Sequence, residues 1–358
     1  MSRLSEEIPD HPRAHSVASN NSMVSAHIVL TDLSSVGEAR RVGLRLAATL
    51  GMSEVKSGEL AILITEAARN AIIHGGGGQL VISAIPNGLS EKKIDVVALD
   101  QGPGIKDVSQ AFQDGYSTAG TPGTGLGAIR RMAVAFDLFS NPKGTALLAQ
   151  VREADESSIS SSKNVLEIGG MAVPIAGEIA CGDAIVTAQA SNRTMIMVVD
   201  GLGHGIEAAN AAKEAVRIFQ SRVGDTPADI LGRVHDALKK TRGAAAAIAE
   251  IRPLSGILNY AGVGNISGVV MSSKGNRSLV SHNGTLGHIL TRVQEFKVDW
   301  PSDGILIMHS DGLQSRWDLA GYPGILARAP AVIAGVLLRD FRRQRDDSSV
   351  VVVKGCRP

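Results

Sequence analysis

Two stretches of the chain show no periodic spacing of hydrophobic residues, and each precedes a segment in which hydrophobic residues recur at helix or strand spacing. Residues 1–24 are rich in Ser, Asn, His and Pro, and residues 153–164 contain the polar run EADESSISSSK. Neither stretch can bury much apolar surface, so we expect a mobile tail and a linker. They leave two domains, 25–152 and 165–358, each long enough to bury its own core.

The first segment mixes helix and strand patterns. Apolar residues at helical spacing predict helices over 36–51 and 58–75, each ending at a glycine, and a third helix over 128–139. Alternating or continuous apolar runs predict strands over 26–33, 79–85, 92–100 and 144–151. This order predicts an α+β fold in which helices cover one sheet.

The second segment is richer in strands than the first. The predicted strands cover 182–190, 194–201, 244–251, 256–263, 267–273, 304–312 and 348–354. Helical patterns occupy 206–220, 228–241 and 331–341. Many strands with few helices predict two sheets packed together with helices on the outside.

Composition and charge exclude several classes of protein. The chain has 358 residues, of which 44% are hydrophobic and 20% charged, which is a globular balance. Lys and Arg number 36 against 35 Asp and Glu, so the net charge of +1 gives no general field for nucleic acid. Aromatic residues make up only 3%, so the cores must be aliphatic. We expect no nucleic-acid partner.

Targeting and redox signals point to the cytoplasm. The two cysteines, Cys181 and Cys356, cannot form a disulfide framework, which suits a reducing compartment. The N-terminal sequence MSRLSEE lacks the apolar run of a signal peptide. The uncharged stretch 253–273 contains Asn, Tyr and Gly and is typical of strand–turn–strand. We therefore expect a cytoplasmic protein without membrane insertion.

The first group of candidate functional residues lies on the second predicted helix. Glu66, Asn70 and His74 are four residues apart and share one helix face. Asn is unfavourable in mid-helix, because its side chain competes for backbone hydrogen bonds. A carboxylate and an amide on one face can hold a metal ion and orient a nucleophile. A solvated polar face explains the pattern equally well.

Two glycine-rich segments follow this helix. Asp100 ends an apolar strand and is followed by Gly102 and Gly104, so a carboxylate that can accept from adenine's amine stands beside small residues. An ordinary turn is the alternative. A second tract, with Gly123, Gly125 and Gly127, enters a helix whose N-terminus suits phosphate. Neither a Walker nor a Rossmann pattern is present.

These three motifs, taken in order, resemble those of the GHKL ATPase superfamily. EAARN at Glu66–Asn70 is similar to its N box, DQGPG at Asp100–Gly104 to its first glycine box, and GTGLG at Gly123–Gly127 to its second. The segment looks most like the small anti-sigma-factor serine kinases, particularly the switch kinases of stressosome-type pathways. The resemblance implies a GHKL (Bergerat) α/β sandwich over 25–152 with a short lid.

The same resemblance implies a role for each motif. Asp100 would bind the adenine of ATP, Asn70 would bind Mg²⁺, and Glu66 would be the base that activates an acceptor hydroxyl. The glycine boxes would approach the nucleotide. The acceptor would be a Ser or Thr of a STAS-domain anti-sigma-antagonist or stressosome-like protein. A sigma factor or a downstream phosphatase is a further expected partner.

Acidic residues at strand ends form the second group of candidates. Asp183 begins one predicted strand, while Asp200 and Asp311 each end an apolar run and precede Gly. Asp346 and Asp347 precede the last strand. Clustered carboxylates raise each other's pKa unless a cation neutralises them, and hard oxygen ligands suit Mg²⁺ or Mn²⁺. The alternative is that each Asp-Gly pair only forms the turn of a β-hairpin.

The second segment resembles the bacterial branch of the PPM-type metal-dependent Ser/Thr phosphatases that includes the sporulation and sigma-regulation enzymes. The matching motifs are GEIACGD at 177–183, VVDGLGHG at 198–205, YAGVGN at 260–265, HSDGL at 309–313 and RDDSSVVVV at 345–353. The resemblance implies a PPM-type α-β-β-α sandwich with two metal ions. Its expected ligands are Asp183, Asp200, the Gly201 carbonyl, Asp311 and Asp346.

Some residues of this segment depart from the family pattern or have no clear role in it. Asp346 rather than Asp347 occupies the ligand position of the family pattern, and Gln314 stands where many relatives carry an acidic residue. We expect His204 to pack in its loop, with a ligand or an acid as the alternatives. No arginine of this segment can be assigned to substrate phosphate from the sequence.

The two resemblances together predict a bifunctional signalling switch that phosphorylates and dephosphorylates Ser/Thr on STAS-domain partners. Two alternatives remain. One is a phosphatase whose ATP-binding half only senses nucleotide or docks a partner. The other is a non-enzymatic anti-sigma factor.

Overall fold

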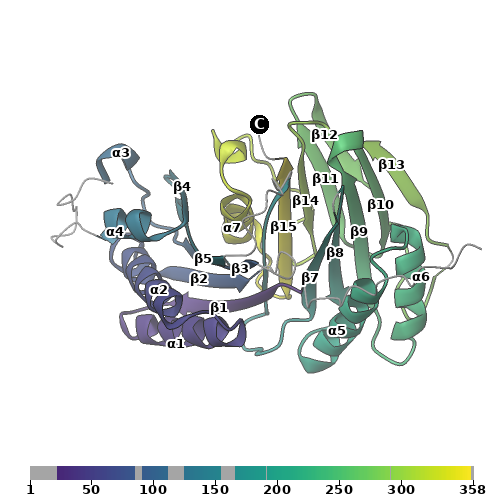
Figure 1. The fold of residues 1–358 in the computed structure, drawn as a ribbon, viewed down its shortest axis with the longest axis horizontal. Helices are drawn as coiled ribbons and strands as arrows, with labels where there is room; N and C mark the ends of the chain where they lie inside the picture. The colour runs from purple at the N-terminus through teal and green to yellow at the C-terminus, as the bar shows by residue number, and fades with distance from the viewer. Residues whose placement is uncertain are drawn as a thin grey trace, which may run out of the picture.

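Three five-stranded sheets form the framework of the chain (Figure 1). The computed structural model describes residues 22–84, 91–111, 125–154, 166–190, 192–290 and 292–355. The strand orders are β1-β2-β3-β5-β4, β13-β10-β9-β8-β7 and β12-β11-β14-β15-β6. The first sheet belongs to the first predicted domain and the other two belong to the second. The expected α+β, two-domain fold is confirmed.

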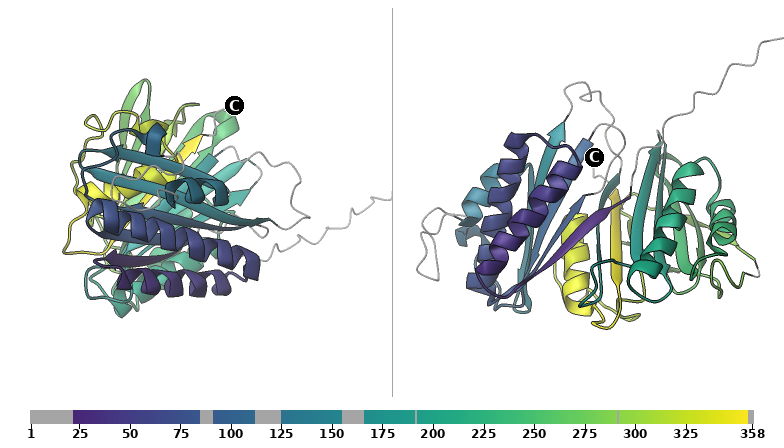
Figure 2. Two further views of the ribbon diagram at one scale, coloured as in Figure 1. Left: turned by 90° about the vertical axis from the view of Figure 1, so that its left-hand side faces the viewer. Right: turned by 90° about the horizontal axis from the view of Figure 1, so that it is seen from below.

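The first domain places its helices over one face of an antiparallel sheet. Its elements are β1 (Val24–Leu30), α1 (Ser34–Thr49), α2 (Glu54–Gly75), β2 (Gly78–Ala84), β3 (Glu91–Leu99), α3 (Val108–Ala111), α4 (Gly125–Met132), β4 (Ala135–Asn141) and β5 (Gly144–Ala154). Ser53 caps α2 by accepting from the Lys56 N–H, and Gly76 ends it in the left-handed conformation. Helices α1 and α2 lie side by side over one face of the sheet (Figure 2). Leu60, Leu63 and Ile64 of α2 are fully buried in the core between the helices and the sheet.

The second domain is a sandwich of two sheets. Its elements are β6 (Leu166–Val173), β7 (Asp183–Ala190), β8 (Arg193–Gly201), α5 (Ile206–Ser221), α6 (Pro227–Leu238), β9 (Ala244–Arg252), β10 (Ile257–Val263), β11 (Ser267–Ser272), β12 (Gly275–Leu279), β13 (Glu295–Asp299), β14 (Ile305–His309), α7 (Pro330–Phe341) and β15 (Ser348–Gly355). One core fills the space between the sheets, and α5 and α6 cover the outer face of the β7–β13 sheet. On the other outer side lies α7.

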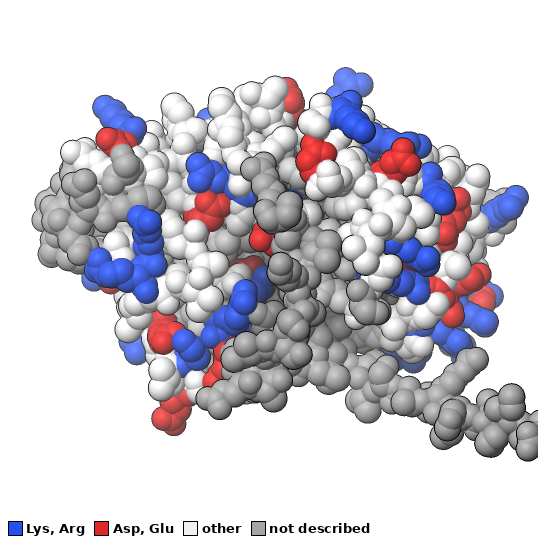
Figure 3. Space-filling model, turned by 45° about the horizontal axis from the view of Figure 1, so that its top comes forward, with Lys and Arg blue, Asp and Glu red and all other residues white. Residues whose placement is uncertain are grey.

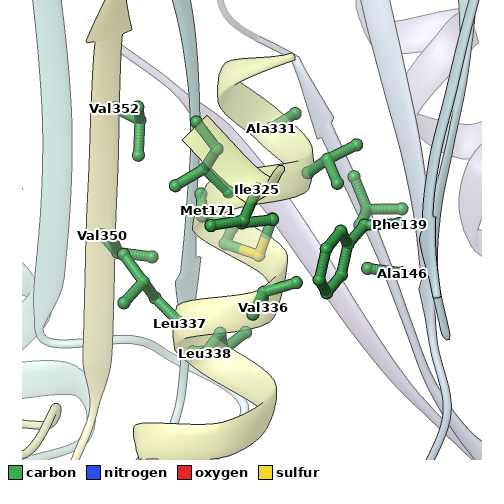
Figure 4. Close-up of a cluster of buried hydrophobic side chains, with 14 of the residues drawn as sticks. Phe139, Ala146, Met171, Ile325, Ala331, Val336, Leu337, Leu338, Val350 and Val352 are labelled. Carbon is green, nitrogen blue, oxygen red and sulfur yellow. The ribbon is translucent and has the colours of Figure 1, made fainter. Parts of the chain in front are cut away.

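Helix α7 is shared between the two domains. It is apolar and buried on every side from Pro330 to Arg339, as expected of a helix enclosed by other elements. Val350 and Val352 of β15 pack on one side of it, while Phe139 and Ala146 of the first sheet pack on the other (Figure 4). The face of the first sheet that lies opposite α1 and α2 is therefore shielded from solvent by α7. It contributes to a hydrophobic core that both domains share.

Polar contacts fix α7 and its neighbours to the first domain. Asp137 of β4 accepts a hydrogen bond from the Ala329 N–H, at the start of α7, over 2.6 Å, and its other oxygen lies 3.3 Å from the Arg328 guanidinium. An acceptor from another domain thus satisfies a free N–H at this helix end. The Ser83 hydroxyl also donates to the Gly170 carbonyl of β6 at 3.3 Å.

The predicted helix over 128–139 is wrong beyond its first turn. Helix α4 ends at Met132, and the remainder forms β4, which pairs with β5 from Ala135 to Asn141. Leu138 is buried in the core under α2, whereas Phe139 is buried in the core around α7. Consecutive side chains can reach opposite faces in a strand but not in a helix. Burial on two faces therefore overrides the helical spacing.

Other differences lie at element ends and in short strands. The sequence patterns missed β6, β12 and β13. Ser22 bridges Val186 and the Met23 N–H donates to the Ile185 carbonyl, so the end of the predicted tail lies against β7. Strand β5 continues through Glu153 into the predicted linker. Within the described ranges, no helix combines the length and the apolar character needed to cross a bilayer.

Gly335 tests the contact between α7 and the first sheet. A Cβ at this position would lie 2.8 Å from Leu99 Cδ2 and 3.1 Å from Val97 Cγ1. We expect Gly335→Val to lower the free energy of unfolding by about 1–3 kcal/mol, because overpacking strains a filled core. Urea unfolding measures the change.

Gly232→Val on α6 is the matched control, since a Cβ there meets nothing within 4 Å. We expect this control to keep the stability of the unaltered chain or to raise it slightly, as glycine is a poor helix former. Equal stabilities of the two variants would contradict the close packing of α7.

Candidate functional sites

The first site is a pocket of about 540 Å³ between α2, α4 and the first sheet. Helix α2 contributes Asn70 and His74 to its wall, and the strand ends contribute Asp100 and Thr145. Leu138 and Leu147 supply apolar surface. An apolar pocket with a few convergent polar groups is typical of a small-molecule site.

Asp100 is held in a fixed orientation at the base of this pocket. Its Oδ1 accepts from the Gly102 N–H at 2.9 Å and from the Thr145 N–H at 3.1 Å. Burial raises the pKa of the Asp100 carboxyl above its usual value, while these two hydrogen bonds oppose the rise. The carboxylate is therefore an oriented acceptor in a partly apolar setting, as recognition of an exocyclic amine requires.

Glu66 and Asn70 meet the second glycine segment at the start of α4. A Cβ on Gly125 would lie 2.9 Å from Glu66 Oε2 and 3.2 Å from Asn70 Oδ1. The absence of a side chain at Gly125 lets α4 lie directly against these two polar groups. Gly127 is buried within α4, and Gly123 lies outside the described residues.

The glycines after Asp100 serve the protein's own packing. A Cβ on Gly102 would lie 2.7 Å from Gly75 Cα, and Gly104, with a φ of +73°, approaches the Asn141 carbonyl. These contacts close the loop onto α2 and β4, and Gly104 also lines the pocket. Sequence reasoning missed Leu138 and Leu147 as lining residues, because their position follows from the register of β4 with β5.

The second site gathers carboxylates at one end of the sandwich. Asp183 and Asp200 are direct partners in the antiparallel register of β7 and β8. Asp311 follows the end of β14, and its Oδ2 accepts from the Asn265 amide at 2.7 Å. Ser310 donates to Asp183 Oδ2 at 2.5 Å, so the β14 end is tied to the β7 start. The sheet register and this hydrogen bond thus bring the acidic residues at the strand ends close together, as the sequence predicted.

Like charges perturb this cluster strongly. Burial, together with Asp183, Asp311 and the 346–347 pair, raises the pKa of Asp200 to about 9. Burial also raises the pKa of Asp183 to about 7, and it raises that of Asp346 with help from Asp311. Carboxylates that ionise so reluctantly need a cation to stay charged at neutral pH.

Asp346 and Asp347 have different surroundings. Both carboxylate oxygens of the buried Asp347 accept backbone N–H groups at 2.7 Å, from Ile175 and from Gly182. Asp346 is only half-buried, and the Asp347 N–H donates to its Oδ1 at 2.9 Å. Asp347 therefore anchors the segment before Asp183, and Asp346 is the member of the pair with an oxygen available for a ligand.

The oxygen donors fit hard divalent cations. Among the described residues, no three His, Cys, Asp or Glu side chains converge closely enough to enclose a single ion. The carboxylates at this edge supply oxygen donors only, which hard divalent cations such as Mg²⁺ prefer. His204 pairs with Glu178 instead, Nδ1 to Oε1 at 2.7 Å, a partner that sequence reasoning did not identify.

The face of the molecule that is drawn in Figure 3 has mixed charge. On the face drawn in Figure 3, basic and acidic side chains are interspersed without a continuous field of one sign. This distribution agrees with the net charge of +1. Charge attraction at this face is therefore local.

Family models match both halves of the chain. A histidine kinase-like ATPase domain matches residues 29–151. A model described as stage II sporulation protein E (SpoIIE) matches residues 190–354.

Curated relatives divide in the same way. The serine/threonine-protein kinase RsbT of Bacillus subtilis (strain 168) is 36% identical over 102 residues, which are 28% of this chain and 76% of that protein. An anti-sigma F factor of Thermoanaerobacter sp. (strain X514) is 32% identical over 80 residues, 22% of this chain and 56% of that protein. The phosphoserine phosphatase RsbX of B. subtilis is 26% identical over 141 residues, 38% of this chain and 69% of that protein.

Solved structures with similar folds include a chain from a study of the bacterial stressosome as a modular system adapted to secondary messenger signalling. It is 31% identical, covers 53% of this chain and 99% of its own, and has a TM-score of 0.49. RsbX in complex with magnesium is 20% identical, covers 55% of this chain and 98% of its own, and has a TM-score of 0.48.

The chain therefore belongs to the histidine kinase-like ATPase family through its first domain, and its second domain matches the stage II sporulation protein E (SpoIIE) model over residues 190–354.

Proposed function

We propose that the chain is a bifunctional switch: its first domain phosphorylates, and its second dephosphorylates, Ser or Thr on STAS-domain partner proteins. The observation that carries the proposal is that one chain keeps reactive groups in both sites. Glu66 and Asn70 lie against Gly125 beside the pocket of the first domain. Asp183 and Asp200 are direct partners at the sandwich edge, where Asp311 and Asp346 are near enough to raise the pKa of Asp200. The two activities divide at the linker predicted over 153–164.

The kinase half has a role for each polar group. Asp100 accepts from the adenine amine, and its burial keeps water from competing for the bond. Asn70 would hold the Mg²⁺ that accompanies the triphosphate, and Glu66 would accept the proton of the attacking hydroxyl. Proton transfer to a positioned base contributes about 10²–10⁴ in rate. A protein that only sensed nucleotide would have no need for Glu66 beside Asn70.

The phosphatase half uses its carboxylates as ligands. Asp183, Asp200, Asp311, Asp346 and the Gly201 carbonyl would hold two divalent ions, Mg²⁺ or Mn²⁺. Such ions supply Lewis acidity and an activated water for hydrolysis of the phosphoester. The chain's own part is to orient this donor set. Ser310 fixes Asp183, Asn265 fixes Asp311, and Asp347 holds the preceding loop.

A protein substrate fits the surroundings of the carboxylates. Ile179, Leu202 and Ile206 are exposed by 101%, 41% and 71%, and all three lie in the segments next to Asp183 and Asp200. Exposed apolar groups beside an active site are typical of surfaces that contact another protein. Anti-sigma-antagonist or stressosome-like proteins with STAS domains are the proposed substrates, because RsbT, RsbX and the anti-sigma F factor are the named relatives. A sigma factor or a downstream phosphatase is a further candidate partner.

A second candidate function is a phosphatase whose first domain senses nucleotide. The observation that favours it is the burial of α7 between the two domains, with Arg339 Nη1 3.5 Å from the Asp100 carbonyl. Transfer of label from ATP to a STAS-domain protein separates the two candidates. Transfer supports the switch, and nucleotide binding without transfer supports the sensor.

Asp200 gives a prediction that links pH to stability in the metal-free protein. Its folded pKa of about 9 exceeds the unfolded value of about 3.9, so the folded state binds more protons between these values. The stability of the chelator-treated protein should therefore fall as pH rises from about 4 to about 9. Asp200→Asn removes this titration and should raise Tm at pH 8 by roughly 2–4 °C for each kcal/mol gained.

Differential scanning calorimetry in chelator at pH 5 and pH 8 measures this effect. The gain from Asp200→Asn should be larger at pH 8 than at pH 5. A variant with Tm equal to or below that of the unaltered chain at pH 8 would contradict the raised pKa.

The switch predicts opposite effects of two substitutions on one phosphopeptide signal. Asp200→Asn removes a ligand charge from the phosphatase site, so phosphorylated partner should accumulate. Glu66→Ala removes the base, so the partner should stay unphosphorylated, with a rate loss of about 10²–10⁴. Mass spectrometry of the partner after incubation with ATP and Mg²⁺ or Mn²⁺ reads both.

Asp225→Asn, in the turn between α5 and α6, is the control and should match the unaltered chain. An unchanged phosphorylation level in the Asp200→Asn protein, with an active kinase half, would mean that the halves serve different substrates.

A further inference from the structure

We propose that Arg242 binds the phosphate group of the substrate at the carboxylate cluster. This inference rests on the proposed phosphatase function and adds a cation to a site in which acidic side chains predominate. Arg242 lies in the turn between α6 and β9, away from each sequence motif of the phosphatase resemblance. Only the folded chain brings it near the site.

The turn is joined to the loop that follows Asp200. The Leu202 N–H donates to the Gly243 carbonyl at 3.0 Å. A Cβ on Gly203 would lie 3.1 Å from Arg242 Nη1. The guanidinium therefore rests on the backbone two residues after Gly201, whose carbonyl is an expected metal ligand.

The backbone of this turn is fixed, whereas the arginine side chain is not engaged. The Arg242 carbonyl pairs with His288 Nε2 at 2.9 Å, and the Gly243 N–H donates to the Thr241 hydroxyl at 3.0 Å. Gly243 has a φ of +80°, and a Cβ there would lie 2.6 Å from the Leu286 carbonyl. The exposed Arg242 guanidinium has no hydrogen-bond or ion-pair partner among the described residues.

Other charged groups near the cluster, Glu178, His204 and Arg342, already have partners within the protein. Glu178 pairs with His204 at 2.7 Å and does not neutralise Arg242. Arg342, another guanidinium near the cluster, is half-buried and donates to the Pro174 carbonyl at 2.6 Å. A phosphate dianion approaching four carboxylates is repelled by them, and a planar guanidinium can bind two of its oxygens at once.

The test compares Arg242→Ala and Arg242→Lys with Arg222→Ala, a control at the far end of the 16-residue helix α5. The probes are a phosphoserine peptide and inorganic phosphate as a product inhibitor, with saturating Mn²⁺. We expect Arg242→Ala to raise KM and the inhibition constant of phosphate by about tenfold or more. Arg242→Lys should recover part of the loss, and Mn²⁺ affinity should be unchanged.

Two outcomes would overturn the proposal. One is an unchanged phosphate inhibition constant in Arg242→Ala, and the other is a loss explained wholly by weaker Mn²⁺ binding. Failure of the proposed function is distinguishable, because the unaltered chain would then hydrolyse no phosphoester with Mn²⁺ present.

The contacts of α7 carry a second, independent inference: we infer that nucleotide in the Asp100 pocket changes phosphatase turnover through this helix. Arg339 is buried and pairs with Asp340 through two bonds of 2.8 Å. Its Nη1 lies 3.5 Å from the Asp100 carbonyl. The last turn of α7 thus touches the strand end that carries the expected adenine acceptor.

The same helix end is bonded to the segment after Asp311. The Gln314 N–H donates to the Phe341 carbonyl at 2.9 Å, and the Arg343 N–H donates to the Gly312 carbonyl at 2.7 Å. Asp346 follows three residues after Arg343. A shift of α7 on nucleotide binding would therefore move carboxylates on both sides of it, and a coupling of this kind typically changes affinity or turnover by about 5–150-fold.

Hydrolysis of the phosphoserine peptide at fixed free Mn²⁺, with and without ADP, tests this coupling. We expect ADP to change kcat/KM at least fivefold in the unaltered chain, and Arg339→Met to reduce that change. Equal kcat/KM with and without saturating ADP would overturn the inference, while leaving hydrolysis itself and the role of Arg242 unaffected.

Discussion

The burial of α7 between two sheets is the constraint on which the rest of the structure depends. Val81, Val97 and Leu99 face this helix, while their neighbours along the same strands face α1 and α2, so the first sheet is buried on both faces. Neither domain could lose the contact without exposing a large apolar surface to water. The nucleotide pocket and the carboxylate edge are consequently held in one frame, with the end of α7 beside each.

The two sites differ in how many carboxylates they bring together and in what stabilises the negative charge. The pocket of the first domain holds the half-buried Asp100 carboxylate, whose orientation is fixed by backbone N–H groups. The phosphatase edge holds several carboxylates that raise one another's pKa and are folded together at a cost. Such a cluster makes sense as a cation site, and a phosphate substrate then needs a positive group whose donors are free, unlike Arg342, which donates to the Pro174 carbonyl. Arg242 stands where that group is needed.

The gathering of acidic residues at one edge of the sandwich was predictable from the sequence, whereas the contacts that support them were not. Asp183 begins one strand and Asp200 ends the apolar run of the next, and the antiparallel register of β7 and β8 makes them direct partners. The choice between Asp346 and Asp347 needed the backbone donors of Ile175 and Gly182, which are over 160 residues away. The helical spacing around Phe136 gave a wrong element, because a strand buried on both faces can imitate it. The helical pattern over 331–341 predicted α7 as an outer helix of the second domain, but not that the first domain would cover it.

The central claim is that one chain runs both reactions on the same partner. The most direct measurement is the phosphorylation level of a STAS-domain partner over time, with the unaltered chain, excess ATP, Mg²⁺ and Mn²⁺. A switch with both activities predicts an intermediate plateau that is reached from fully phosphorylated and from unphosphorylated partner alike, with ATP consumed throughout. A partner that goes to complete phosphorylation, or that gains no phosphate at all, would contradict the account.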